Sequence, residues 1–342
     1  MFADSRVSGK HPRSGFRCAG PDWYRCRMLE RPFSRRALFA LAATGASQLL
    51  LSGCSVLPFA RHDSDSAPLR AQPGKDVMWI PTPEPRVRRM LQLAGCGPED
   101  RVVDLGSGDG AIVFAAARDC GATALGIEYD PGLVEHARRV AEAAGLANRV
   151  QFEKADLFEV DFSEATIVTM YLQRHLNLRL RHRLMALRPG TRVVSHEFDL
   201  GAWRPDETSR VGTGVVHLWI VPTNAGGEWA LRIGEREGSE TLRLRLRQRY
   251  QDLLGTASID DAETSIRGGR VEGRVVRFAF TDRDGRLLRF EGRVDTDRIT
   301  GTVRDGRAEH AFSGLRIGLA PSLIGASPAT EVDALDQPGE AR

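Results

Sequence analysis

The sequence predicts an α/β protein in which a doubly wound sheet is followed by a small antiparallel, barrel-like all-β domain. In residues 77–224, short apolar strands alternate with amphipathic helical segments, which is the pattern of a parallel sheet covered by helices. In residues 225–320, apolar residues recur at every second position, which is the pattern of half-buried antiparallel strands. The 342 residues of the chain leave room for both domains.

Helix and strand signals place the elements of the first domain. One helix begins at Pro131, which suits a first helical turn, and stops at Gly145. The last helix carries an apolar face formed by Leu176, Leu180, Leu184 and Leu187. The expected elements, in chain order, are a helix in 83–95, a strand and glycine-rich turn in 101–110, a helix in 111–120, a strand in 122–130, a helix in 131–145, strands in 149–158 and 165–172, a helix in 176–190 and a strand in 191–199.

The second domain is predicted from alternation and from turn residues. Residues 241–250 alternate leucine with arginine, which predicts a strand with one buried and one solvated face. Asp284-Gly285 and Asp305-Gly306 predict two tight hairpin turns. The arginine face could also contact anionic lipid headgroups or an acidic partner, although a solvated face is simpler in an arginine-rich chain. Residues 321–342 are expected to form a disordered tail.

A leader is expected in residues 1–54. The apolar run 37–51 is shorter than the ~20 residues that span a bilayer, and a polar, proline-containing stretch follows it. Arg35 and Arg36 before the run match the twin-arginine export pattern. The run ends in Leu-Ser-Gly-Cys, which resembles a bacterial lipobox in which Cys54 is acylated.

The leader also predicts a location. Met28 begins a signal of conventional length, so we interpret residues 1–27 as a mis-called extension and residues 28–54 as the signal. Residues 55–76 are expected to be a flexible tether. The protein is therefore expected in the cell envelope, exported in the folded state and attached to the membrane through Cys54 on the periplasmic side. The alternative location is the cytoplasm.

Composition and cysteine spacing indicate which kinds of partner and site are not expected. The net charge of +3 is close to balance, so no nucleic-acid partner is predicted. The five cysteines form no CxxC pair and no zinc spacing, so neither a metal site nor a disulfide framework is expected. Cys96 and Cys120 are expected to be small buried core residues, with a single bridge between them as the alternative in an exported protein.

The glycine-rich turn after the first strand fits two kinds of ligand. Gly106, Gly108 and Ala111 satisfy the loose dinucleotide fingerprint. Asp104, however, stands where dinucleotide folds are normally apolar, because an anion there would repel the pyrophosphate. A carboxylate suits a ligand with a cationic amino group, which the glycines allow the backbone to approach closely. A nicotinamide-dependent dehydrogenase is therefore disfavoured.

Two further acids follow the next two strands. Glu128 ends the second strand, placed to accept hydrogen bonds from both hydroxyls of a ribose. Asp156 follows the third strand, placed to accept a hydrogen bond from an adenine amino group. The carboxyl ends of parallel strands form the ligand-binding edge of such a sheet. Acids after three successive strands are hard to explain as solvated loop charges.

The segments VVDLGSGDG, GIEYD and KADLF together resemble the first three motifs of the class I, seven-strand, Rossmann-like S-adenosylmethionine-dependent methyltransferases. The resemblance covers about residues 77–222 and implies S-adenosyl-L-methionine as the cofactor. It also implies a set of binding residues. These are Asp104, Gly106, Ser107, Gly108 and Gly110 for the methionine end, Glu128 for the ribose, and Asp156 with the backbone of Leu157 for the adenine.

Three shorter segments, WIPTPEPRVRRML, IVTMYL and RVVSHEFD, are similar to a branch of bacterial proteins related to protein-lysine methyltransferases. That group includes enzymes acting on mitochondrial membrane carriers and on the c-ring protein of ATP synthase. The similarity implies an N-methyltransferase with an amine acceptor, for which a protein lysine is the candidate. The fourth strand ends in Met170-Tyr171-Leu172 rather than Asp/Asn-Pro-Pro-Tyr, which disfavours an adenine or glutamine acceptor.

Candidate catalytic residues follow from what methyl transfer requires. The reaction depends on positioning and on exclusion of water, and a lysine must also lose a proton from a group whose unperturbed pKa is about 10.4. Tyr171, His196 and Glu197 are expected at strand ends facing the acceptor, where they could desolvate or deprotonate an amine. The structural alternatives are a pocket wall for Tyr171 and anchors of the following loop for His196 and Glu197.

The alternative function is a non-catalytic envelope lipoprotein that uses the fold as a binding module. The unsubstituted motif residues favour a working site instead. One conflict concerns the compartment, because S-adenosylmethionine is made in the cytoplasm whereas the leader predicts export. Action before export, a periplasmic supply, an inefficient leader and a fold that now only binds are all compatible with the sequence.

Overall fold

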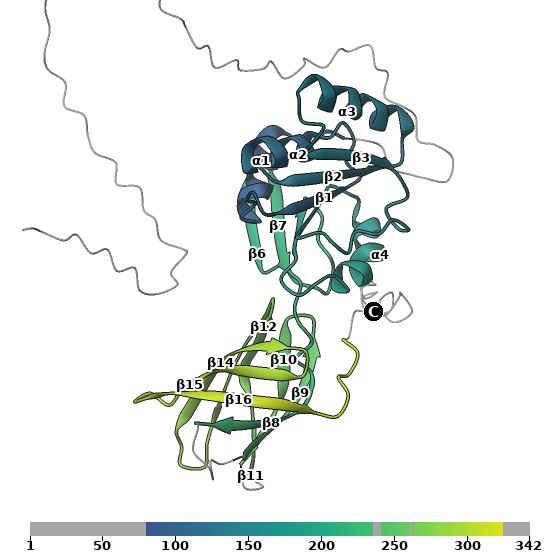
Figure 1. The fold of residues 1–342 in the computed structure, drawn as a ribbon. Helices are drawn as coiled ribbons and strands as arrows, with labels where there is room; N and C mark the ends of the chain where they lie inside the picture. Colours follow the sequence, from purple (N-terminus) through teal and green to yellow (C-terminus); the bar gives the residue numbers. More distant parts are fainter. Residues whose placement is uncertain (1–79, 235–240, 260–261, 324–342) are drawn as a thin grey trace, which may run out of the picture. The chain divides into compact units, whose positions relative to one another are not determined.

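The computed structural model describes residues 80–234, 241–259 and 262–323 (Figure 1). These residues form a mixed seven-stranded sheet and an antiparallel nine-stranded sheet, which confirms the predicted fold class. The predictions for residues 1–76, including Arg35, Arg36 and the lipidation site Cys54, lie outside the described residues. So does most of the expected tail, from residue 324 onward. None of the described helices is long and apolar enough to cross a membrane.

The first sheet has the strand order β3-β2-β1-β4-β5-β7-β6. The first five strands are parallel, and β7 runs antiparallel to both β5 and β6. The strands are β1 (Arg101–Leu105), β2 (Thr123–Glu128), β3 (Val150–Lys154), β4 (Ile167–Met170), β5 (Arg192–His196), β6 (Glu207–Val211) and β7 (Gly214–Ile220). The sequence pattern does not predict β6 and β7. β6 is an edge strand with no fully buried residue, so it carries no apolar alternation.

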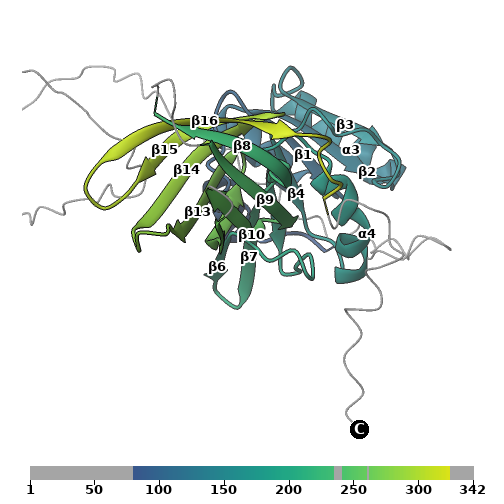
Figure 2. The same cartoon turned by 90° about the horizontal axis from the view of Figure 1, so that it is seen from below.

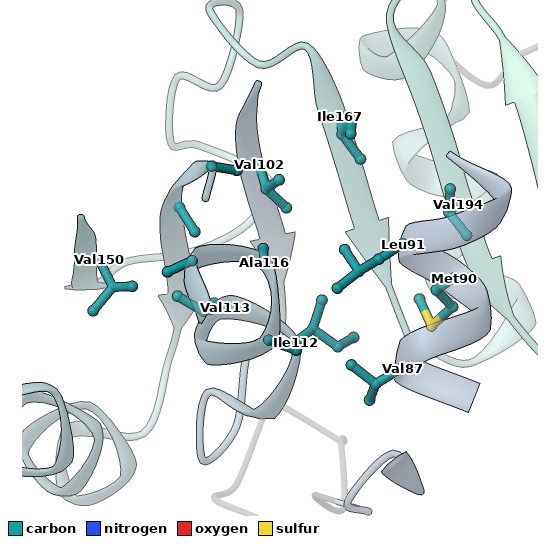
Figure 3. Close-up of a cluster of buried hydrophobic side chains, with 14 of the residues drawn as sticks. Val87, Met90, Leu91, Val102, Ile112, Val113, Ala116, Val150, Ile167 and Val194 are labelled. Atoms are coloured by element: carbon teal, nitrogen blue, oxygen red, sulfur yellow. The ribbon is translucent and has the colours of Figure 1, made fainter. Parts of the chain in front are cut away.

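The helices cover both faces of this sheet. They are α1 (Glu84–Leu93), α2 (Ala111–Ala115), α3 (Pro131–Ala143) and α4 (Arg174–Met185). α1, α2 and α3 pack on one face, where Val102 and Ile167 of the sheet meet Met90 and Leu91 (Figure 3). α4 packs on the other face through its predicted apolar stripe, whose leucines are all buried.

The segment after α2 differs from the predicted α-helix. Residues Ala116–Cys120 continue α2 as a π-helical turn, η1, which Gly121 ends in a left-handed conformation with φ +71°. The same small residues face the core in either helix type, so the apolar pattern does not distinguish them. Cys120 at the end of η1 and Cys96 are free thiols that are only partly buried, which corrects the prediction that both are buried core residues.

The second sheet is a closed eight-stranded barrel with one additional strand. The ring runs β10-β12-β13-β14-β15-β16-β8-β9, and the pairing of β9 with β10 closes it. β12 pairs with β10 at Asp252 and Leu253, and β11 pairs with β10 farther along, at 256–259. Figure 2 shows β8, β9, β10 and β13 to β16 of this sheet from below the view of Figure 1. The strands are β8 (Gly227–Ile233), β9 (Thr241–Arg249), β10 (Asp252–Ile259), β11 (Ala262–Ser265), β12 (Arg267–Glu272), β13 (Val275–Thr281), β14 (Leu287–Asp295), β15 (Arg298–Arg304) and β16 (Glu309–Ile317).

The barrel confirms the predicted alternation in β9. Its leucines Leu242, Leu244 and Leu246 are buried in the barrel core, and the intervening arginines are exposed. Both predicted hairpins are present, joining β13 to β14 and β15 to β16. Unlike the exposed arginines of β9, Arg316 of β16 is buried: its guanidinium lies over the Trp229 ring and donates to the carbonyls of Asn224 and Thr296.

Candidate active site

Asp104 lies at the carboxyl end of β1 and is almost completely buried, with 2% of its surface exposed. Its Oδ1 accepts a hydrogen bond of 2.7 Å from the hydroxyl of Thr169 on the neighbouring strand β4. Burial raises the pKa of the Asp104 carboxyl to about 7, the hydrogen bond from Thr169 opposes that rise, and Glu128 and Asp109 add to it. An ammonium group of a ligand would stabilise the ionised form of such a buried carboxyl.

The glycine-rich turn after β1 depends on left-handed backbone at three positions. Gly106, Gly108 and Gly110 have φ values of +79°, +54° and +86°, which other residues adopt only at a cost. A side chain at Gly110 would collide with the rings of Phe152 and Phe114, since its Cβ would lie 2.6 and 2.9 Å from them. Because the glycines adopt these conformations and carry no side chain, the backbone of the turn can approach a ligand closely at the carboxyl ends of the strands.

Glu128 at the end of β2 holds the turn in place. Its Oε2 accepts a hydrogen bond of 2.9 Å from the Gly108 amide, and its Oε1 accepts from the amides of Tyr129 and Asp130 at 2.8 and 2.9 Å. The carboxylate has about four lone-pair sites, so it can still accept from a ligand hydroxyl. The predicted ribose-binding residue is thus joined to the predicted methionine-binding turn across 20 positions of sequence.

Asp156 and Leu157 lie in the loop after β3. The Asp156 Oδ1 accepts a hydrogen bond of 2.9 Å from the Phe158 amide, and the Leu157 carbonyl accepts one of 2.9 Å from Arg183 of α4. Arg183 also donates to the Val160 carbonyl, so α4 fixes the shape of this loop. Both predicted adenine-binding residues are partly buried at the same edge as Asp104 and Glu128.

Ser107 has a different environment from its neighbours. Its Oγ is buried and has no hydrogen-bond partner among the described residues. It packs against Gly126 of β2, where a Cβ would lie 2.6 Å from the hydroxyl oxygen. The Ser107 side chain therefore lies beneath the turn, and its amide donates to the Ile127 carbonyl.

The three predicted catalytic residues lie together at the ends of β4 and β5. The rings of Tyr171 and His196 have centroids 4.0 Å apart, and Glu197 Oε2 lies 3.6 Å from His196 Nε2. The imidazole is completely buried, whereas the Glu197 side chain is 39% exposed. Glu197 has a left-handed backbone with φ +70°, an uncommon conformation for a residue other than glycine that is found at functional sites.

Leu172 connects the predicted acceptor edge, formed by Tyr171, His196 and Glu197, to the glycine-rich turn. Its side chain packs against Gly106 so closely that a Cβ at that glycine would lie 2.8 Å from Leu172 Cδ2. Because Leu172 directly follows Tyr171, this contact brings the predicted acceptor residue Tyr171 near the predicted cofactor-binding turn. Sequence reasoning places both sets at the strand ends but does not predict this contact.

Arg86 is a polar residue of the acceptor edge that sequence reasoning misses. It lies in the first turn of α1, and its Nη1 is 3.0 Å from His196 Nε2. Burial, with a smaller contribution from the nearby Arg86 cation, lowers the pKa of His196 to about 4, and Glu197 opposes the shift. The only sequence signal is the position of Arg86 inside the segment WIPTPEPRVRRML, where it resembles an ordinary surface arginine of an amphipathic helix.

No group of three or more histidine, cysteine, aspartate or glutamate side chains that could hold a metal ion occurs in the part of the chain that the structure describes.

Comparison with known proteins identifies the family. The family described as the ANTKMT methyltransferase domain matches residues 104–207. A protein-lysine N-methyltransferase of Saccharolobus islandicus is 42% identical over 151 residues, which cover 42% of this chain and 94% of that protein. The chain belongs to this methyltransferase family. It is an S-adenosylmethionine-dependent methyltransferase, and S-adenosylmethionine is its methyl donor. This finding favours the predicted enzyme over the non-catalytic binding module.

Two mouse relatives match this chain over a smaller share of their own length, whereas a solved bacterial structure matches over most of its length. A lysine N-methyltransferase of Mus musculus, named for the c-ring protein of ATP synthase, is 35% identical over 41% of this chain and 58% of its own. The mouse adenine nucleotide translocase lysine N-methyltransferase is 36% identical over 47% of this chain and 67% of its own. A solved structure from Salinibacter ruber, described as an RNA methyltransferase in complex with S-adenosyl-L-homocysteine, is 52% identical, covers 42% of this chain and 94% of its own, and has a TM-score of 0.41.

Proposed function

We propose that this methyltransferase transfers the methyl group to a protein lysine. The observation that carries the proposal is the acceptor edge, where a half-exposed carboxylate, Glu197, lies beside the uncharged rings of Tyr171 and His196. A carboxylate at the entrance attracts a lysine ammonium, and uncharged rings behind it favour the neutral amine, because burial disfavours the charged form. The names of the archaeal and mouse relatives support the same acceptor class.

The residues present fit the methyl donor. The buried Asp104 would hold its ammonium group, the turn from Gly106 to Gly110 its methionine end, Glu128 its ribose hydroxyls, and Asp156 with Leu157 its adenine. S-adenosylmethionine supplies the electrophilic methyl group when bound. The protein then has to place a neutral amine in line with that group and exclude water.

His196 is too weak a base to take the proton of a lysine. Its pKa of about 4 lies roughly 6 units below the pKa of about 10.4 of a free lysine, a difference of about 8 to 9 kcal/mol. Tyr171 and His196 therefore act as the water-excluding wall, one of the two roles predicted for them. Glu197 attracts the ammonium form at the entrance, and the proton can leave to solvent there because the Glu197 side chain reaches the surface.

The acceptor can be tested by transfer of a radiolabelled methyl group from S-adenosylmethionine to protein and RNA fractions of a strain that lacks this gene. We expect alkali-stable label in protein, found by mass spectrometry as methyllysine. Tyr171→Ala should lower the transfer rate by about 100-fold because the acceptor loses its wall, while donor affinity stays unchanged. Tyr171→Phe, which keeps the ring against His196, should retain most activity.

Two outcomes would contradict this assignment. Label in RNA rather than protein would show a nucleic-acid acceptor, as the description of the Salinibacter ruber protein has it for that enzyme. Equal transfer rates for Tyr171→Ala and the wild type would remove Tyr171 from the site.

We further propose that the enzyme is exported by the twin-arginine route and anchored in the cell envelope through Cys54. The support is the order of Arg35-Arg36, a short apolar run and Leu-Ser-Gly-Cys in the sequence. Fractionation of cells should find the wild type in membranes and Cys54→Ala released from them, with Cys96→Ala as the control for loss of a thiol. Wild-type protein found only in the soluble cytoplasmic fraction would support the cytoplasmic alternative and exclude the anchor.

A further inference from the structure

The contact between Arg86 and His196 determines which nitrogen of the imidazole carries the proton. A guanidinium has only hydrogen-bond donors, so His196 Nε2, 3.0 Å from Arg86 Nη1, has to accept. The proton of the neutral ring is then on Nδ1. The charge of Arg86 also opposes a second proton on the ring, so the neutral form persists well below pH 7.

The Nδ1–H group that results is buried and unpaired within the described part of the chain. His196 is 0% exposed, and its Nδ1 has no hydrogen-bond partner among the described residues. Leaving a buried donor unpaired costs about 1–3 kcal/mol, so such a group marks a place where a ligand can pair with it. The ring lies against Tyr171, the predicted wall of the acceptor site.

The surrounding structure holds Arg86 in this position. Its amide donates to the Pro83 carbonyl in the first turn of α1, and its Nη2 donates to the Thr213 hydroxyl at 3.2 Å. Gly214, the first residue of β7, leaves room for the guanidinium, because a Cβ there would lie 2.5 Å from Arg86 Cζ and Nε. Helix α1 and strand β7 thus direct this arginine to His196 from two sides.

We propose that Arg86 is a positioning residue that holds His196 as the neutral, Nδ1-protonated tautomer and so presents its Nδ1–H to an oxygen of the bound methyl acceptor. The inference rests on the proposed function, in which this edge binds the acceptor. It adds Arg86 as the residue that makes His196 Nδ1 a hydrogen-bond donor. Arg86 and Glu197 are the charged groups that act on the imidazole, with opposite effects. The Nδ1–H group orients the acceptor through a hydrogen bond. The buried, uncharged ring offers no counter-charge to an ammonium group, so burial beside it favours the neutral amine.

The tautomer can be measured directly in the full-length protein labelled with ¹⁵N-histidine. Long-range ¹H–¹⁵N correlation should show Nδ1 protonated in the wild type and the other tautomer gaining population in Arg86→Met. Gly214→Ala should have the same effect, because the added methyl group displaces the guanidinium without removing its charge. Arg89→Met is the matched control, since Arg89 of the same helix binds Ser209 and Glu207. An unchanged tautomer in Arg86→Met would overturn the proposal.

The consequence for transfer is tested with whichever fraction, protein or RNA, accepts label from the wild type. Arg86→Met and Gly214→Ala should lower kcat at least 10-fold with the affinity for S-adenosylhomocysteine unchanged, and Arg86→Lys should recover part of the loss. A changed tautomer with unchanged kcat would exclude the positioning role. Label in RNA would instead contradict the lysine acceptor, and the tautomer measurement would still decide the role of Arg86.

Discussion

Replacing Asp104 with asparagine should weaken S-adenosylhomocysteine binding by about 100- to 1,000-fold at pH 7.5. Truncating one partner of a buried charge pair costs about 2–5 kcal/mol, and Asp104 is the buried acid at the glycine-rich turn. Asparagine keeps the size of the side chain and can still accept from Thr169, so the fold should persist. Isothermal titration calorimetry measures the affinity, with Asp119→Asn, which removes a surface carboxylate paired with Arg118, as the control.

The same carboxyl predicts how binding depends on pH. Only ionised Asp104 pairs with a ligand ammonium group, and its pKa is about 7 in the free protein. Between pH 7.5 and pH 5.5 the ionised fraction falls about 25-fold, so the affinity should fall about as much. This dependence should vanish in Asp104→Asn. Binding that is indifferent to pH and to the substitution would exclude Asp104 as the ammonium site.

The stability of the ligand-free protein should change with pH in the opposite direction from ligand binding. This difference distinguishes the loss of a ligand contact from damage to the fold. Because the folded-state pKa of Asp104 is raised from 3.8 to about 7, the folded protein binds this proton more tightly than the unfolded chain. The contribution of Asp104 to the free energy of unfolding therefore decreases as pH rises from about 4 through 7. Asp104→Asn should be more stable than the wild type at pH 7.5, although it binds the ligand less well.

Gly110→Ala should lower the free energy of unfolding by about 2–5 kcal/mol and abolish measurable donor binding. The left-handed backbone costs an alanine about 1–2 kcal/mol, and the clash with Phe152 and Phe114 adds about 1–3 kcal/mol of overpacking. These rings pack against each other with centroids 5.3 Å apart. Moving them would shift the turn whose amide at Gly108 is bonded to Glu128.

Gly145→Ala is the matched control for this experiment. Gly145 is also left-handed, with φ +67°, but nothing lies within 4 Å of the Cβ it would gain. Chemical denaturation should therefore show a loss of only about 1–2 kcal/mol, with donor binding retained. Equal losses for both substitutions would mean that the clash at Gly110 is relieved at no cost.

Local sequence patterns predict the cofactor side of the site because of how a parallel sheet is connected. Each crossover helix returns the chain to the same edge of the sheet, so residues after successive strands become neighbours whatever the details of packing. Asp104, Glu128 and Asp156 follow this rule, and all three lie at the carboxyl ends of β1, β2 and β3. The pattern of alternating leucines in β9 predicts its buried face for a similarly local reason.

The acceptor side depends on contacts that no local pattern encodes. Arg86 and His196 are 110 positions apart, and they meet because α1 packs against β5 and against β7, a strand added antiparallel to the sheet. The closure of the barrel is a second example, because the strand pattern does not predict that β9 pairs with β10.

The two-domain fold class and the methyl donor can be inferred from the amino-acid sequence, and so can the gathering of the predicted cofactor-binding acids and glycines at one edge of the sheet, because strand succession and turn chemistry are local properties. Three features of the predicted acceptor edge emerge only from the folded chain: His196 is buried with a lowered pKa, Arg86 Nη1 contacts its Nε2, and Glu197 alone of the predicted catalytic side chains is exposed. The reason is that pKa and hydrogen-bond roles follow from burial and from neighbours, and these are set by packing between segments distant in the chain.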